Sequence, residues 1–352
     1  MSKSIFYQEA PLFGFDIGFN SIKLMQINTS GKTDIVEGYG FASFDSRYID
    51  KGAVVNPKAI AKEVYDLINM NMVGKISTKR VAVSVPAART FIRPLSLPKM
   101  SDEDLKQAVL TDAEQYIPMQ VDDLYIDYEI VDQGKETEVV VVATPKKVVD
   151  SYYKLFDLLD LEVGMIETSI SASTRLVMHA ERTDVPTLII DFGSVSTDLS
   201  VFDTVFRIAG TVSEGGDQMT KSLSQGLAIT QRQAEALKSQ SGLAPGKRQK
   251  QILETISPIL TRMLGEIKKI IKFYEERSEQ KRKLEQIVIL GGGANMPGLA
   301  DYLTDHLRLP VRMCNPWLNL DFKKLQPPHQ SEKTIYATAA GLALVKPEDI
   351  HD

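Results

Sequence analysis

Apolar residues recur in short strand-like runs at the start of the chain, separated by Gly, Ser and Asn. Three of these runs are rich in branched and aromatic residues and predict an antiparallel opening: 12–17, 22–27 and 34–42. A helical spacing of apolar residues then covers 57–72, with Asn56 as the expected cap and Pro57 at the first helical position. Alternating valines predict a further strand at 80–86.

Residues 87–163 predict an inserted unit of mixed type. The pattern there indicates a strand, a helix, two strands, a helix and a strand, over 90–97, 101–116, 124–131, 137–144, 145–159 and 161–166. Ser101 and Asp104 form a capping-box-like start to the first of these helices. We expect the six segments to form one compact α+β arrangement.

The second half of the chain begins as the first half does. After a predicted helix at 169–180, three strands repeat the opening pattern: 187–192, 197–202 and 205–212. A helical region covers 216–278, and Pro258 is expected to start or kink its last helix. A strand, a helix, a strand and an Ala/Gly-rich helix are expected in the remainder: 286–290, 294–308, 309–313 and 333–345.

Two segments match each other at an offset of 175 residues, the difference between positions 16 and 191. Asp16 matches Asp191, Gly18 matches Gly193, and Ser21 matches Ser196. Each segment lies at a strand–turn–strand corner that opens one half of the chain. The repeat is too short for a solenoid and indicates two related lobes.

Such a pair of turns has a specific chemical use. Glycine lets backbone N–H groups approach phosphate oxygens closely, and an aspartate at a strand end can hold Mg2+ directly or through water. A later run, Gly291 to Gly293, follows an apolar strand and precedes a helix, which suits a nucleoside lying against bare backbone. Each turn alone is also compatible with an ordinary hairpin, so the matched pair and the glycine run carry the hypothesis together.

Composition and charge narrow the class of protein. The 352 residues are 43% hydrophobic and 25% charged, which is ordinary for a globular protein, and the net charge is −5. A mildly acidic surface argues against broad nucleic-acid binding. With one cysteine, Cys314, no export signal and no run of apolar residues long enough for a membrane span, we expect a cytoplasmic protein.

Two phosphate turns and a late glycine-rich turn, in this order, resemble the actin, DnaK-chaperone and sugar-kinase superfamily. The resemblance covers nearly the whole chain, and the insertion falls where the FtsA and PilM families carry their extra subdomain. Several stretches are similar to the PilM family of pilus-assembly proteins in particular: 16–18 with 21–23, Ala234 to Lys238, Glu266 to Lys269 leading to Phe273 and Tyr274, and Asn315 with Pro316.

The resemblance implies an actin-like, two-lobed α/β fold of duplicated ribonuclease H-like domains with an inserted α+β subdomain. It implies four subdomains. Subdomain 1A would hold 12–86, 164–187 and 333–346, and the inserted subdomain 1C would hold 87–163. Subdomain 2A would hold 188–214 and 286–332, and subdomain 2B would hold 215–285.

The resemblance also implies ATP or ADP with Mg2+ as cofactors and a role for each matching residue. Asp16 and Asp191 would hold the Mg2+ shell, through water, and Lys23 would contact the phosphates. The other nucleotide contacts would come from the two turns, the later glycines and one Glu/Lys pair: Gly18, Asn20, Ser21, Gly193, Thr197, Gly215, Gly216, Gly291, Gly292, Gly293, Glu266 and Lys269. For Glu266 and Lys269, an ordinary surface ion pair is the alternative. Glu167 is a candidate water-orienting residue, with a partly buried structural glutamate as its alternative.

Phe19 departs from the family pattern, because the family usually has a small residue at this position. A phenyl ring so close to the phosphates puts efficient hydrolysis, and also nucleotide binding, in doubt, so at most a slow ATPase is expected.

The PilM family implies a cytoplasmic, ATP-binding scaffold of the type IV pilus machinery. Its partners would be the N-terminal tail of a PilN-like inner-membrane protein and other pilus-assembly proteins, with possible self-association. The short polar segment after residue 346 predicts no membrane anchor of its own, so membrane contact would go through partners. An FtsA-like filament-forming division protein and a small-molecule kinase of the same superfamily are the alternatives.

Overall fold

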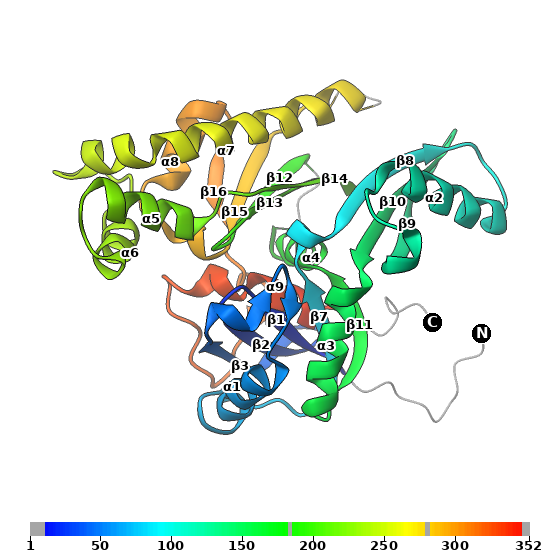
Figure 1. The fold of residues 1–352 in the computed structure, drawn as a ribbon, viewed down its shortest axis with the longest axis horizontal. Coiled ribbons are helices and arrows are strands. Elements are labelled where there is room, and N and C mark those ends of the chain that lie inside the picture. The colour runs from blue at the N-terminus through cyan, green and yellow to red at the C-terminus, as the bar shows by residue number, and fades with distance from the viewer. Residues whose placement is uncertain (1–10, 182–184, 279–281, 347–352) are drawn as a thin grey trace.

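Two sheets with the same strand order form the centres of two lobes in the computed structural model, which describes residues 11–181, 185–278 and 282–346 (Figure 1). The first sheet has the order β11-β7-β1-β2-β3-β17, and the second has the order β14-β13-β12-β15-β16. The strands of the first sheet are β1 (Phe13–Ile17), β2 (Ser21–Asn28), β3 (Asp34–Ser43), β7 (Arg80–Val85), β11 (Glu162–Thr168) and β17 (Leu320–Asp321), with β6 (Val73–Gly74) beside β3. The strands of the second sheet are β12 (Thr187–Phe192), β13 (Thr197–Asp203), β14 (Val205–Val212), β15 (Gln286–Leu290) and β16 (Val311–Met313).

The duplicated turns hold equivalent places in these two sheets. In each sheet the first strand pairs antiparallel with the second and parallel with the fourth, so β1 corresponds to β12 and β7 to β15. The carboxyl ends of parallel neighbours meet at one edge of a sheet. Residues that follow β1 and β7, or β12 and β15, are therefore brought together.

Small residues let two helices pack closely at the centre of the molecule. The helices α4 (Ser169–Glu181) and α9 (Ala337–Ala343) lie against each other between the lobes (Figure 1). A Cβ atom on Gly341 would lie 1.9 Å from the carbonyl oxygen of Ala172, and one on Gly14 would lie 2.0 Å from that of Ala339. Glycine is required at both positions because the backbones themselves are in contact.

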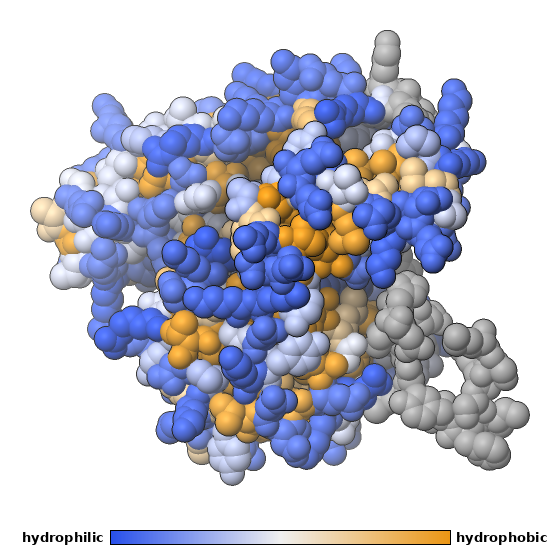
Figure 2. Space-filling view, turned by 45° about the vertical axis from the view of Figure 1, so that its right-hand side comes forward, coloured by the Kyte–Doolittle hydropathy of each residue, from blue (hydrophilic) through white to orange (hydrophobic). Residues whose placement is uncertain are grey.

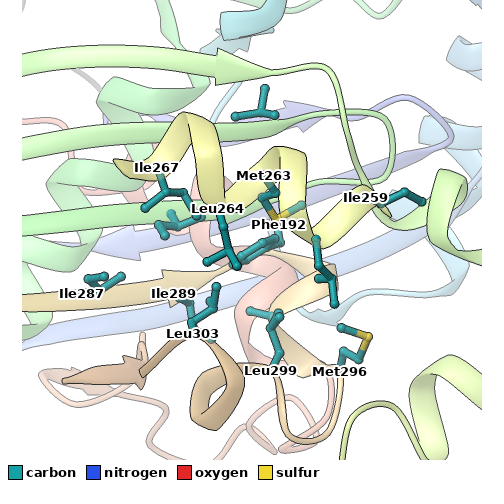
Figure 3. Close-up of a cluster of buried hydrophobic side chains, with 14 of the residues drawn as sticks. Phe192, Ile259, Met263, Leu264, Ile267, Ile287, Ile289, Met296, Leu299 and Leu303 are labelled. Carbon is teal, nitrogen blue, oxygen red and sulfur yellow. The ribbon is translucent and has the colours of Figure 1, made fainter. Parts of the chain in front are cut away.

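The second lobe buries a large apolar cluster between its sheet and its helices (Figure 3). The long helix α7 (Gln249–Arg277) contributes Met263 and Ile267, which lie near Phe192, and α8 (Leu299–Leu307) contributes Leu303. Two shorter helices, α5 (Gly216–Gly226) and α6 (Gln231–Gln240), complete this lobe. Pro258 lies inside α7, so the expectation that it starts the helix is wrong.

The inserted subdomain projects from the body as a three-stranded sheet of order β8-β10-β9 with one covering helix (Figure 1). Its elements are β8 (Phe91–Leu97), α2 (Asp102–Tyr116), β9 (Leu124–Gln133) and β10 (Thr137–Pro145). Its own small core joins Leu105 and Val109 of α2 to Val139 and Val141 of β10.

The inserted unit is smaller than the six segments expected from the sequence. The helix α3 (Lys146–Leu158) packs in the core of the first lobe, where the rings of Phe156 and Phe15 meet edge to face at 5.1 Å, and β11 pairs with β7. The helix itself was predicted at 145–159, but it belongs to the first lobe and not to the inserted unit. In the first lobe, α3 is accompanied by α1 (Pro57–Met70) and by a short ladder of β4 (Ile49–Asp50) and β5 (Ala53–Val54).

Two further boundaries differ from the prediction. The helix expected over 294–308 begins only at Leu299, because Gly298 takes a left-handed conformation with φ +78° and separates it from a 3-10 turn at Gly292–Asn295. The strand β17 lies in the first sheet, whereas the sequence analysis assigned residues up to 332 to the second lobe. The other 3-10 turns are Ser46–Tyr48, Ala87–Arg89, Val121–Asp123 and Lys333–Tyr336. The predicted polar end of the chain after Lys346 lies outside the described residues.

Across the three described stretches of the chain, no helix is both long enough and apolar enough to cross a membrane.

Candidate functional site

The two matched turns share one backbone geometry. In the first turn the N–H of Gly18 donates to the carbonyl oxygen of Ser21 at 2.8 Å, and in the second the N–H of Gly193 donates to that of Ser196 at 3.0 Å. A Cβ atom on Gly193 would lie 2.8 Å from the same Ser196 carbonyl oxygen, so the turn has no room for a side chain. The sequence repeat is therefore a structural repeat as well.

In the first turn, the carboxylate of Asp16 is paired and buried. The hydroxyl of Ser84, at the end of β7, donates to its Oδ1 at 3.0 Å, and the ammonium of Lys23 donates to its Oδ2 at 3.1 Å. Only 11% of the Asp16 side chain is exposed. Of the other predicted residues of this turn, Ser21 is buried, Gly18 is half-buried, and Asn20 is exposed, while Phe19 is half-buried.

In the second turn, Asp191 faces a second acid in place of a lysine. The register pairs Asp191 with Asp198, as it pairs Asp16 with Lys23. Burial raises the pKa of Asp191 to about 7, and the charge of Asp198 adds to this rise, while a hydrogen bond from the Ser173 hydroxyl opposes it.

Asp198 is itself a perturbed acid. Burial raises its pKa to about 6, although the hydroxyls of Thr211 and Ser169 donate to its two oxygens at 2.8 and 3.2 Å. The pair Asp191 and Asp198 therefore forms an electrostatically unfavourable centre when both groups are ionised, and a cation or a proton relieves it.

The two turns lie close enough to interact electrostatically. The pKa of Asp191 is raised further by the charge of Asp16 and lowered by the charge of Lys23, although these residues belong to the other lobe. This places the carboxylates of both turns in one electrostatic environment between the lobes, as the hypothesis of a two-turn clamp requires.

The late glycine run lies beside the second turn because β15 runs parallel to β12. Gly291 has φ +83°, and a Cβ atom there would lie 2.3 Å from Oδ1 of Asp191. A Cβ atom on Gly293 would lie 2.8 Å from the Cβ atom of Phe192. The hydroxyl of Thr334 donates to the carbonyl oxygen of Gly291 at 2.9 Å and holds the run in place.

Gly215 and Gly216 also lie against the second turn. The N–H of Gly216 donates to the carbonyl oxygen of Gly193 at 3.0 Å. A Cβ atom on Gly215 would lie 2.4 Å from the carbonyl oxygen of Ser194. Thr197 is fully buried, and its hydroxyl donates to the carbonyl oxygen of Glu214 at 2.8 Å. The structure thus gathers most of the predicted glycines around Asp191.

A Glu/Lys pair that the sequence analysis missed lies at these glycines. Lys238 of α6 is 9% exposed, and its ammonium donates to the carbonyl oxygen of Gly216 at 3.0 Å and contacts Glu235 at 2.8 Å. The signal was present, because Glu235 and Lys238 are three residues apart on a helix within the stretch already compared with the PilM family.

The predicted pair Glu266 and Lys269 lies on α7 as a surface ion pair. The two side chains are 2.7 Å apart, and 48% and 73% of their surfaces are exposed. A nucleotide contact by this pair stays a prediction.

Glu167 lies at the end of β11 with both carboxylate oxygens engaged. The guanidinium of Arg175 donates to them at 2.5 and 2.8 Å, and 7% of the glutamate side chain is exposed. The pairing suits a structural role, and the water-orienting role also stays a prediction.

The residues present fit a Mg2+-nucleotide in two respects. The glycine backbones of both turns are bare, and a cation would relieve the buried Asp191 and Asp198. In the described part of the chain, no group of three or more His, Cys, Asp and Glu residues is placed to hold a metal ion. Mg2+ usually keeps several waters and binds through one or two carboxylates and the phosphates of its ligand, so two aspartates suffice.

Comparisons with known proteins agree with this architecture. A family model described as "Type IV pilus assembly protein PilM" matches residues 14–346. Among curated proteins, FtsA cell division proteins of Streptococcus pneumoniae and Neisseria meningitidis are 21% and 22% identical to the chain. Each alignment covers 86% of this chain, with 75% and 83% of the respective relatives.

Solved structures share the fold. The structure described as "PilM-PilN type IV pilus biogenesis complex" has a TM-score of 0.83 and 22% identity, covering 98% of this chain and 100% of that one. The ethanolamine utilization protein EutJ of Carboxydothermus hydrogenoformans has a TM-score of 0.55 at 15% identity, covering 96% and 90% of the two chains. MreB 5 of Spiroplasma citri, bound to AMPPNP, has a TM-score of 0.50 at 11% identity and covers 95% of each chain. The actin-like fold predicted from the sequence is confirmed.

Proposed function

The chain belongs to the PilM family of type IV pilus assembly proteins, and from this premise we propose that it is a nucleotide-dependent scaffold of the pilus machinery. It binds ATP or ADP with Mg2+ between its lobes and docks the cytoplasmic tail of a PilN-like inner-membrane protein beside the inserted subdomain. Such docking would hold it at the inner membrane, where further pilus-assembly proteins and other copies of the chain can reach it.

The observation that carries the nucleotide proposal is the pair of identical turns with a buried acid at each. Backbone N–H groups of the two glycine turns would hold phosphates, and Asp16 and Asp191 would hold the hydrated Mg2+. Lys23 would exchange its contact with Asp16 for a phosphate oxygen. Gly291 to Gly293 and the pair Glu235 and Lys238 would border the nucleoside.

Calorimetry with ATP and Mg2+ tests this proposal. We expect micromolar binding by the wild type and none by the double variant Asp16→Ala with Asp191→Ala. The matched control is Asp301→Ala with Asp305→Ala, which removes two acids of α8 and should bind ATP as the wild type does. Equal ATP binding by the turn variant would refute the two-turn clamp.

The docking proposal is supported by exposed aromatic side chains between the inserted subdomain and the first lobe. Tyr125 of β9 and Tyr153 of α3 are 47% and 45% exposed. The Tyr125 hydroxyl donates to Asp150 at 3.0 Å, and the ammonium of Lys146 lies 5.5 Å from the Tyr125 ring centre. Figure 2 shows hydrophobic side chains gathered in the hollow beneath the inserted subdomain.

The edge of the inserted sheet supports the same location. β9 is one of the two outer strands in the order β8-β10-β9, and the other, β8, packs near β14, so the free sheet edge is that of β9. An extended peptide can pair with such an edge and place alternate side chains in pockets.

Fluorescence anisotropy with a labelled peptide of the cognate PilN N-terminal tail tests the docking. We expect the double variant Tyr125→Ala with Tyr153→Ala to weaken binding at least about tenfold, as for aromatic interface anchors. Tyr65→Ala, which removes an exposed tyrosine of α1, is the matched control and should leave the affinity unchanged. Unchanged affinity in the double variant would exclude this surface.

A further inference from the structure

Asp198, the acid opposite Asp191, has hydrogen bonds that lead away from the nucleotide site in two directions. One begins at Ser169, whose hydroxyl donates to Oδ2 at 3.2 Å, and the other at Thr211, whose hydroxyl donates to Oδ1 at 2.8 Å. Ser169 opens α4, and Thr211 lies on β14 at the edge of the second sheet.

The first route reaches the entry to the inserted subdomain. The Oγ of Ser169 accepts the N–H of Ala87 at 3.1 Å, and Ala87 begins the 3-10 turn that leads into β8. At the base of the inserted subdomain, the hydroxyls of Thr90 and Thr144 lie 3.2 Å apart. They join the start of β8, which enters the subdomain, to the end of β10, which leaves it. A displacement at Ala87 therefore acts on both connections.

The second route reaches the sheet of the inserted subdomain through β14. Arg207 of this strand donates to a carboxylate oxygen of Glu138 on β10 at 2.5 Å. Both ends of this ion pair lie next to register shifts in their strand pairs. The pairing of β13 with β14 passes from Val201–Ile208 to Phe202–Phe206 and skips Arg207, and the pairing of β10 with β9 shifts next to Glu138. A bulge redirects a side chain and recurs next to functional sites.

A cavity separates the two surfaces that this ion pair joins. It holds about 540 Å³ and is lined by residues from both sides, among them Pro94 and Val140 of the inserted sheet and Phe206 and Phe273 of the second lobe. A close-packed interface would transmit strain through every contact. A cavity leaves the subdomain room to move, so its position depends on the Arg207–Glu138 ion pair and on the contacts of β8 with β14.

From this geometry we propose that Asp198 couples nucleotide binding to the position of the inserted subdomain, through Ser169 to Ala87 and through Thr211 and β14 to the Arg207–Glu138 ion pair. This inference deepens the proposed function, on which it rests, because it names how the nucleotide regulates docking of the PilN-like tail. A cation at Asp191 changes the electrostatic environment of Asp198, and the hydroxyl groups that bind Asp198 adjust with it.

Double electron–electron resonance, which measures the distance between two spin labels, tests the coupling in the full chain. Spin labels on Lys135→Cys, at the exposed turn of the inserted sheet, and on Lys250→Cys, 88% exposed on α7, report the separation of the two parts. The native Cys314 is buried and stays unlabelled. With saturating ATP and Mg2+, we expect the distance in the wild type to change by roughly several ångströms, as in domain rotations.

The decisive variant is Ser169→Ala with Arg207→Met, which interrupts both routes. At saturating ATP we expect it to lose the distance change, and we expect the effect of ATP on tail affinity to fall from roughly tenfold, typical of coupled sites, to less than about twofold. The matched control is Thr174→Val with Arg312→Met, which removes a buried hydroxyl bond between α4 and β13 and the ion pair between Arg312 of β16 and Glu181 of α4, without touching either route.

The outcomes separate this inference from the proposed function. Loss of the distance change in the double variant and its retention in the control support the coupling. A wild type that binds ATP by calorimetry without any distance change overturns the coupling alone, as does a double variant that still responds. A wild type that binds no ATP overturns the proposed function and this inference together.

Discussion

The two matched glycine turns have the same backbone hydrogen bond, but the residue paired with the aspartate carries opposite charge in the two turns. The hydrogen bonds of Gly18 and Gly193 differ by only 0.2 Å, from 2.8 to 3.0 Å. The matched position across the hairpin is Lys23 in the first turn and Asp198 in the second. The first carboxylate is therefore neutralised within the chain, whereas the second depends on a cation or a proton. The duplicated turn therefore keeps its backbone shape while the charges that surround its two carboxylates differ.

The largest effect should come from adding a side chain to the second turn. A Cβ atom on Gly193 meets a backbone oxygen at 2.8 Å, whereas one on Gly18 meets the flexible end of Lys23 at 2.9 Å. We expect Gly193→Val to lower the free energy of unfolding by about 3 kcal/mol or more, and Gly18→Val by about 1–2 kcal/mol. Urea denaturation measures both, and equal losses would contradict this difference between the turns.

Comparable in size is the pH dependence of the second turn. The pKa values of Asp191 and Asp198 are raised from 3.8 to about 7 and about 6, so the folded chain binds more protons than the unfolded chain between about pH 4 and 7. The stabilisation present near pH 4 is lost as the pH rises through the folded pKa values. We expect these two groups to lower the free energy of unfolding by roughly 3–5 kcal/mol from pH 4.5 to 7.5, with the larger share from Asp191. Comparing the wild type with Asp191→Asn plus Asp198→Asn isolates their share, and identical pH profiles would contradict it.

Substitutions at the matched positions 23 and 198 should change the free energy of unfolding by smaller amounts and in opposite directions. Lys23→Met leaves the buried Asp16 without its ion-pair partner and should destabilise the nucleotide-free chain by about 1–2 kcal/mol. Asp198→Asn removes the repulsion with Asp191 and should stabilise it by about 1–2 kcal/mol at pH 7.5. Thermal unfolding at fixed ionic strength measures both changes. Destabilisation by Asp198→Asn would show that its hydrogen bonds outweigh the repulsion.

The smallest effect should come from the exposed pair on α7. Glu266→Ala removes a surface ion pair and should change the free energy of unfolding by less than about 0.5 kcal/mol. Its counterpart Glu235→Ala alters the pair that lies at Gly216, and we expect it to weaken ATP binding more than Glu266→Ala does. Calorimetry with both variants decides which Glu/Lys pair borders the nucleoside.

Local patterns predicted most of the elements and the two turns. The strand pairs around Asp16 and Asp191 lie where alternation and glycine turns placed them, and Asn56 caps α1 through the N–H of Ala59 as expected. Patterns of this kind depend on residues within a few positions of one another, so the sequence expresses them directly. The resemblance built on them identified the family and the fold.

The assignment of segments to partners was less predictable. The helix α3 was predicted at nearly its observed range, but its packing on Phe15 in the first lobe was not. The short strand β17, which joins the first sheet, was not predicted either. An apolar face predicts that a helix is buried on that side, but it does not predict which apolar surface the helix packs against.

The sequence by itself therefore determined the duplicated turns, the late glycine run and the family, because each depends on short stretches with a fixed order. Only the tertiary structure decided that Glu235 and Lys238 lie at Gly216, and that Asp198 joins Ser169 to Thr211. Those contacts join residues that are far apart in the chain, and their geometry follows from how the two sheets, α4 and the inserted subdomain pack together. Packing of this kind depends on the shapes of all the elements at once, which no local pattern contains.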